Sequence, residues 1–112
     1  MSLLAKKCVP CERGTIPLTI QEAQNLLKEI PAWTLSPDVK KISKTFKFKN
    51  FAEALAFTNK IGAIAEAEGH HPDIELTWGK VGVTLATHSI GGLSVNDFIL
   101  AAKIDQIREP VA

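Results

Sequence analysis

The feature that most constrains the fold is a pair of alternating segments on either side of Gly79. Apolar and polar residues alternate through 73–78 and again through 80–88, which is the pattern of half-buried β-strands. A two-residue turn at Gly79-Lys80 would join them as a hairpin. The residues then predicted to face each other are Trp78 and Val81, Leu76 and Val83, and Ile74 and Leu85. A slip of one residue would turn these side chains to the opposite face, so the alternation predicts a defined register.

The open end of this hairpin carries histidines. The same register places His71 opposite His88, with Cα atoms about 4.5–5.5 Å apart if the ladder persists that far. Pro72 donates no backbone hydrogen bond, so this last pair is expected to splay. Because His70 precedes His71, we expect all three histidines of the chain to gather at one end of the sheet.

Three segments show the start signals and the spacing of helices. Each begins at a capping residue that is followed three positions later by an acidic residue: Thr19 and Glu22, Asn50 and Glu53, and Ser94 and Asp97. The predicted helices cover 20–29, 51–68 and the stretch from Ser94 to Pro110. Two further strands are expected at 33–35 and 41–49. The order is therefore helix, two strands, helix, two strands, helix.

Length and composition fit a single globular domain. The chain has 112 residues and a formal net charge of +1, and no apolar run approaches the ~20 residues of a membrane span. The small net charge gives no electrostatic reason to expect nucleic acid or an anionic membrane as a partner. The first residues lack the apolar core of a signal peptide, so we expect a cytoplasmic protein.

The N-terminal residues are expected to lie outside this domain. Residues 1–17 contain two prolines, one glycine and no periodicity, which predicts a loosely ordered tail before a domain at 18–112. Cys8 and Cys11 have the spacing of half a zinc site or of a redox pair. A structural zinc usually needs four ligands, and a redox motif of this type follows a strand. We therefore interpret the two cysteines as free, solvent-exposed thiols.

The histidine corner combines groups that transfer protons. Glu66 lies one helical turn before His70, and Asp97 follows His88 after a short loop. Imidazole titrates near neutrality, and carboxylates can orient its tautomers or stabilise its charged form. A metal site is the alternative, because three histidines and a carboxylate fit zinc. The side chains of His70 and His71 diverge on an extended backbone and lack the i, i+4 spacing of zinc helices, which favours proton transfer.

These residues also form a pattern that resembles the pterin-4a-carbinolamine dehydratases. The resemblance covers the chain from about Thr19 to its end and assigns no role to Cys8 and Cys11. It rests on four motifs: Trp33-x-Leu35, Glu66-x-x-x-His70-His71-Pro72 with Trp78, Thr87-His88, and Gly92-Leu93-Ser94-x-x-Asp97. The implied fold is α+β, with a four-stranded antiparallel sheet and three helices on one face in the order α-β-β-α-β-β-α.

The resemblance implies a dehydratase. The implied reaction removes water from 4a-hydroxytetrahydropterin to give quinonoid dihydropterin, and it recycles the pterin that aromatic amino acid hydroxylases consume. No metal or cofactor is implied. The catalytic residues would be His70, His71 and His88, with His70 and His88 as the acid/base pair and His71 helping to hold the pterin. Glu66 and Asp97 would orient and tune these rings.

Two further residues are placed in the supporting set of the site. Pro72 stiffens the corner, and Trp33 is placed against the pterin pocket, whereas Trp78 is expected in the core. The implied partners are the pterin substrate and further copies of the chain, as a homodimer or homotetramer, and the alanine-rich segment 51–68 offers a surface for close packing. Animal relatives also serve as dimerisation cofactors of a homeodomain transcription factor, so a protein-binding role is the alternative function.

Overall fold

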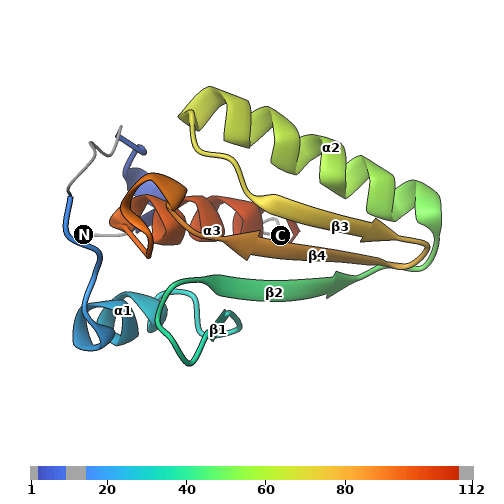
Figure 1. Ribbon diagram of the computed structural model, residues 1–112. Helices are drawn as coiled ribbons and strands as arrows, with labels where there is room; N and C mark the ends of the chain where they lie inside the picture. Colours follow the sequence, from blue (N-terminus) through green and yellow to red (C-terminus); the bar gives the residue numbers. More distant parts are fainter. Residues whose placement is uncertain (1–2, 10–14, 109–112) are drawn as a thin grey trace.

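The chain folds into two layers, with its helices on one face of a single sheet (Figure 1). This computed structural model describes residues 3–9 and 15–108. Its elements are η1 (Leu3–Ala5), α1 (Ile20–Leu27), β1 (Thr34–Leu35), β2 (Ile42–Lys47), α2 (Phe51–Glu68), β3 (Asp73–Thr77), β4 (Lys80–Leu85), η2 (His88–Ile90) and α3 (Val95–Arg108). The strands are antiparallel in the order β1-β2-β4-β3. The predicted α+β fold and its element order are confirmed.

The long helix α2 has the bounds that its cap residues predict. Asn50 is extended, and its side-chain oxygen accepts a hydrogen bond from the N–H of Glu53 at 2.8 Å. Gly69 ends the helix at φ 66°, a left-handed conformation that glycine adopts at the lowest cost. Helix α1 begins as predicted but ends at Leu27, short of the predicted residue 29. No helix within the described ranges is both long and apolar enough to cross a membrane.

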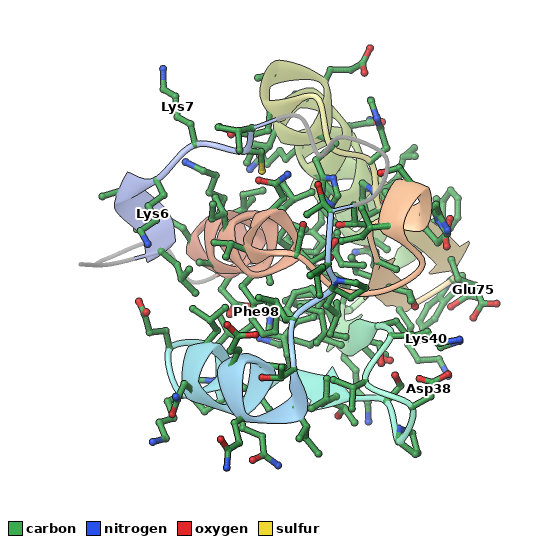
Figure 2. All side chains as sticks on the ribbon, turned by 60° about the vertical axis from the view of Figure 1, so that its left-hand side comes forward. Lys6, Lys7, Asp38, Lys40, Glu75 and Phe98 are labelled. Carbon is green, nitrogen blue, oxygen red and sulfur yellow. The ribbon has the colours of Figure 1, made fainter. Side chains whose placement is uncertain are left out.

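The core lies between the sheet and the helices. The buried inward side chains of β2 and β4 are Ile42, Phe46, Val81, Val83 and Leu85. Phe98 of α3 is fully buried beneath them, in the interior of the molecule (Figure 2). Lys44 also points inward from β2, and its ammonium group lies 2.8 Å from a carboxylate oxygen of Asp105 on α3. The inward face is therefore apolar with one ion pair at its margin.

The hairpin has the predicted faces but a different register. The observed pairs are Thr77 and Lys80, Leu76 and Val81, Ile74 and Val83, and Asp73 and Thr84. Each residue of β3 thus meets a partner two positions earlier than predicted, because the turn is Trp78-Gly79 and not Gly79-Lys80. A shift of two positions preserves the alternation, so the apolar side chains still face the helices and Glu75 points away from them (Figure 2).

Two predictions that depended on this register were wrong. Trp78 lies in the turn and is 68% exposed instead of in the core. The ladder also ends before it reaches the histidines, since β3 starts at Asp73 and η2 begins at His88. Pro72, which cannot donate to a ladder, stands directly before β3. His71 and His88 are therefore not cross-strand neighbours.

Part of the N-terminal segment is packed on the domain. Leu3 is 1% exposed, and the N–H of Cys8 donates to a carboxylate oxygen of Glu68 at 2.8 Å. Residues 3–9 are thus not the loose tail that the sequence predicts, and Cys8 is partly buried and not solvent-exposed. Their partners lie far away along the chain and leave no local pattern in the sequence. Cys11 lies outside the described residues, and the domain boundary at residues 17 and 18 stays a prediction.

Candidate functional site: a buried histidine–carboxylate pair

The end of α2 delivers His70 to the start of α3. Gly69 is left-handed, and the N–H of His70 donates to the carbonyl of Ala65 at 3.2 Å. This cap turns the chain back, and the Nε2 atom of His70 lies 2.6 Å from Oδ1 of Asp97. The side chain of His70 is 12% exposed and that of Asp97 is 0% exposed. The two residues therefore form a pair that is largely shielded from water.

Further donors fix the carboxylate of Asp97. Its Oδ2 accepts hydrogen bonds from the hydroxyl of Thr87 at 2.8 Å and from the N–H of Ser94 at 3.0 Å. The hydroxyls of Thr87 and Ser94 are 2.7 Å apart. Because both oxygens are engaged, the carboxylate has one orientation, and the imidazole that it binds is held in one orientation as well.

His71 makes a similar contact at the surface. Its Nε2 lies 2.5 Å from Oε2 of Glu66, in the last turn of α2. The two side chains are 61% and 78% exposed. Both carboxylates that the sequence places at this corner thus contact a histidine, but the pair of His70 and Asp97 is buried and the pair of His71 and Glu66 stands in solvent.

His88 reaches this region through its neighbour Thr87. Thr87 is buried, and it bonds both to Asp97 and, through its backbone N–H, to the carbonyl of Gly92 at 2.9 Å. His88 then begins η2 with an exposed side chain. Two hydrogen bonds therefore connect the ring of His70 with the residue before His88: one from His70 to Asp97 and one from Thr87 to Asp97. The predicted strand ladder is absent here, and the loop between β4 and α3 makes the connection.

Trp33 lies apart from this cluster. Its indole N–H donates to the carboxylate of Asp105 at 3.1 Å, and its ring meets that of Phe46 edge-on at 6.2 Å between centroids. Asp105 follows Asp97 by eight residues on α3, which is about 12 Å along the helix axis. Trp33 is a buried core residue in this structure. Pro72 is partly buried and leads from the histidine corner into β3.

Two residues of the site were not singled out from the sequence as site residues. Thr87 and Ser94 complete the hydrogen bonds of Asp97. Ser94 could have been found, because a serine three residues before an aspartate predicts a capping box in which the acid accepts from the serine N–H. Thr87 belongs to one motif of the family resemblance, but its contact with Asp97 had no signal in the sequence, since it depends on the path of the loop after β4.

A separate hollow lies on the outer face of the sheet. It has a volume of about 530 Å³ and is formed by β2, β3 and β4. Asp73 and Thr84 line it at the end of the sheet near the histidines, but none of the histidines does. Within the part of the chain that the structure describes, no three His, Cys, Asp or Glu side chains come together closely enough to hold a metal ion.

The buried pair can accept or donate a proton at a defined atom. Since Nε2 of His70 faces Asp97, Nδ1 is the ring nitrogen that remains for a substrate, and no residue in the described ranges bonds to it. With its proton on Nε2, a neutral imidazole accepts a proton at Nδ1, and the charged ring donates one there. The arrangement thus supports general acid/base chemistry.

Comparison with known proteins gives the same direction. Residues 16–107 match the family model described as pterin 4 alpha carbinolamine dehydratase, which leaves residues 3–9 outside the match. A protein of Methylococcus capsulatus that carries pterin-4-alpha-carbinolamine dehydratase in its name is 52% identical over 106 residues, or 95% of this chain and 93% of that protein. One of Halorhodospira halophila, with the same words in its name, is 50% identical over 96% of this chain and 98% of that protein.

Solved structures share the fold. A crystal structure titled transcriptional coactivator/pterin dehydratase, from Brucella melitensis, aligns with a TM-score of 0.78 and 33% identity over 83% of this chain and 99% of that chain. A pterin dehydratase-like protein described as a RuBisCO assembly factor in the alpha-carboxysome aligns with a TM-score of 0.59 and 25% identity over 68% and 88%. A dehydratase is a hydro-lyase, and on the family match and these relatives the chain belongs to the pterin 4 alpha carbinolamine dehydratase family.

Proposed function

We propose that the protein catalyses the dehydration of 4a-hydroxytetrahydropterin to quinonoid dihydropterin by histidine general acid/base catalysis. In this reaction the bond between C4a and the hydroxyl oxygen breaks, and the oxygen leaves as water with a proton from an acid. A base removes the proton on N5, and the electron pair of N5 forms the new double bond between N5 and C4a. The reaction therefore needs one proton donor and one proton acceptor, both of which an imidazole can supply near neutral pH.

The observation that carries this proposal is the buried pair of His70 and Asp97. A ring held at 2.6 Å by a fully buried carboxylate presents Nδ1 without a search among rotamers. Such preorganisation keeps a catalytic proton in place when the substrate binds. The Thr87 and Ser94 bonds to Asp97 keep the carboxylate itself from turning away.

The other two histidines receive different roles. His88 is exposed and follows Thr87, so we assign it the second proton transfer opposite His70. His71 stands in solvent beside Glu66, and we assign it to contact with the bound pterin. Pro72 keeps this contact residue at a fixed distance from β3. Trp33, which lies against Asp105 in the core, receives no part in binding.

The test is a stopped-flow measurement of 4a-hydroxytetrahydropterin breakdown with and without the protein. We expect an acceleration that requires both His70 and His88. The same rates should be obtained after dialysis against a chelator, because the proposed steps use imidazoles alone. Loss of activity on dialysis that a divalent metal restores would contradict this mechanism. A variant without His70 and His88 that keeps the full rate would contradict the acid/base assignment.

We further propose that the protein works as a homodimer or homotetramer in the cytoplasm and recycles the pterin of an aromatic amino acid hydroxylase. Phe51 and Leu55 are large apolar side chains exposed on α2, and β3 is an edge strand. Either surface can be covered by a second copy. Sedimentation that shows only the 12.2 kDa monomer at micromolar concentration would contradict the oligomer.

A protein-binding role is the second candidate, and the exposed apolar side chains of Phe51 and Leu55 favour it. Two related structures carry such roles in their titles, as a transcriptional coactivator and as an assembly factor. Substitution of His70 separates the candidates, since it should slow dehydration on the order of 10²-fold or more and leave binding through α2 unchanged.

A further inference from the structure

The N-terminal segment 3–9, which we call the strap, fastens the two helix ends that carry the buried pair. The strap runs over the end of α2 and the side of α3 (Figure 1). Its consecutive residues Cys8 and Val9 bind different helices: the N–H of Cys8 donates to Glu68 at the end of α2, and the N–H of Val9 donates to the side chain of Asn96 in α3. The two helix ends are thus joined through two successive peptide units of the strap.

The bond to α3 is reciprocal. The side-chain oxygen of Asn96 accepts from the N–H of Val9 at 2.9 Å, and its amide nitrogen donates to the carbonyl of Val9. The carbonyl of Asn96 also accepts from the thiol of Cys8 at 3.6 Å. Asn96 is itself buried. An asparagine side chain that pairs with both the N–H and the carbonyl of one residue binds it as a neighbouring strand would, and it fixes the position of that residue along the helix.

The remaining strap contacts anchor it at its other end. Leu3 is in the core, and its N–H donates to Glu29 at 2.9 Å. Lys103 of α3 donates to the carbonyl of Leu4 at 3.3 Å and lies 3.6 Å from Glu68. The side chain of Lys7, in contrast, points away from the helices (Figure 2). The strap is therefore held at both ends, and its middle carries an exposed charge.

The two helix residues that bind the strap, Asn96 and Glu68, are close in sequence to the residues of the buried pair. Asn96 directly precedes Asp97, and Glu68 precedes His70 by two positions. Successive residues of a helix point about 100° apart, so Asn96 can hold the strap while Asp97 faces His70. The distance between the ends of α2 and α3 sets the distance between His70 and Asp97. The strap fixes that helix distance through Glu68 and Asn96, which lie beside the pair in the sequence.

A second contact of the N-terminal region braces the loop that carries His88. The N–H of Leu18 donates to the carbonyl of Leu93 at 2.9 Å. Pro17 packs so closely on Gly92 that a Cβ atom there would lie 2.8 Å from the Cβ of Pro17. Gly92 also accepts from Thr87, the residue before His88. Residues 17–18 therefore support the loop that carries His88, just as residues 3–9 support the helix ends that carry His70 and Asp97.

We infer that Asn96 and Glu68 are positioning residues of the active site, which act through the strap to hold His70 against Asp97. This inference rests on the proposed function, and it adds a role for a segment outside the region matched by the family model. Neither residue contacts the reacting atoms. Loss of the strap should let the helix ends shift, and a misplacement of 1 Å at a catalytic group can cost about 10²-fold in rate.

The experiment compares Asn96→Ala, which removes both bonds to Val9, with Asn25→Ala, an exposed asparagine in α1 that serves as the matched control. We expect kcat to fall about 10-fold in Asn96→Ala, with KM changed less than about twofold, at a temperature where both variants are fully folded. Asn25→Ala should keep the wild-type kcat. Equal kcat and KM in all three proteins would overturn the inference.

A second pair of variants covers the case in which Asn96→Ala does not fold. Glu68→Ala removes the acceptor of the Cys8 N–H, whereas Glu68→Gln keeps a side-chain oxygen for it. We expect Glu68→Ala to lose kcat and Glu68→Gln to retain most of it. Equal losses in the two would show that the charge of Glu68 matters and not its bond to the strap, and would overturn the inference.

A readout that does not need activity separates this inference from the proposed function. The 15N and 1H signals of the His70 ring report its bond to Asp97. We expect these signals to move in Asn96→Ala and Glu68→Ala and to stay in place in Asn25→Ala. If the wild type shows no dehydratase activity, the proposed function fails, and the ring signals alone test whether the strap positions His70. Unchanged ring signals in the strap variants would overturn the inference in either case.

Discussion

Two histidines of this protein meet carboxylates at nearly the same distance in very different surroundings. His70 lies 2.6 Å from Asp97, with side chains 12% and 0% exposed. His71 lies 2.5 Å from Glu66, with side chains 61% and 78% exposed. The distances alone would rank the pairs as equal. Burial separates them, because water competes for an exposed pair and screens it.

The difference teaches which pair can orient a reaction. In the buried pair, Thr87 and Ser94 hold the carboxylate, and removal of one partner leaves a buried group unsatisfied. In the exposed pair, water replaces whichever partner is lost, and the side chains pay rotamer entropy to stay together. We therefore assign catalysis to the first pair and substrate contact to the second. The predictions below test this division.

The largest effect is expected for His70→Ala. Loss of a positioned acid/base should reduce kcat on the order of 10²-fold or more, because no neighbouring ring is held at the same place by a buried carboxylate. Steady-state rates of 4a-hydroxytetrahydropterin breakdown measure the effect. A loss of the same size in both His70→Ala and His71→Ala would break the comparison.

Stability should separate the carboxylates. Asp97→Asn keeps the shape but replaces a charged acceptor by an amide beside three donors, so we expect the free energy of unfolding to fall by about 3 kcal/mol. Glu66→Gln should change it by less than about 0.5 kcal/mol. Urea unfolding of both variants measures the difference. Similar losses in the two would mean that exposure does not distinguish the pairs.

His71→Ala should change binding more than chemistry. A contact made equally in the ground state and the transition state raises KM and leaves kcat nearly unchanged. We expect a KM several-fold higher, roughly the loss of one partly exposed hydrogen bond of about 1 kcal/mol. A large fall in kcat with unchanged KM would instead give His71 a proton-transfer role.

Features that depend on neighbouring residues could be predicted from the sequence, whereas features that depend on distant contacts could not. Cap residues set the bounds of α2, and alternation set the faces of β3 and β4. The register could not be read correctly, because Trp78 satisfies the alternation equally well as the last strand residue or as the first turn residue. A shift of the strand register by two residues keeps every side chain on its face of the sheet, although it moves Trp78 from the core into water.

The site was predicted in part for a similar reason. His70 at a helix end and Asp97 at a helix start were both expected at the site, but their pairing was not predicted, because the sequence places Glu66 one turn before His70. The route of His88 was predicted through a strand ladder, whereas the observed link is the hydroxyl of Thr87 on Asp97. The strap was missed entirely, since the partners of Cys8 and Val9 lie 60 and 87 positions away.

The smallest effect concerns Cys8, which is partly buried, in contrast to the exposed residues His71 and Glu66. Burial, and next the carboxylate of Glu68, raise the pKa of the Cys8 thiol to about 12, compared with about 8.5 for an unfolded cysteine. The folded state thus favours the neutral thiol. The resulting stabilisation is fully present below about pH 8.5 and is lost as the pH rises from there toward 12.

We therefore compare the chain with its Cys8→Ala variant, both in a Cys11→Ala background. Between pH 8.5 and 10 the protein with Cys8 should lose a few tenths to about 1 kcal/mol more stability than the variant, a range that allows for the partial exposure of the thiol. Urea unfolding of both proteins at the two pH values measures the difference. Parallel losses would show that the unfolding equilibrium does not sense the thiol. Cys8 would then behave like the exposed pair of His71 and Glu66, and the strap that carries it would be open to water at alkaline pH.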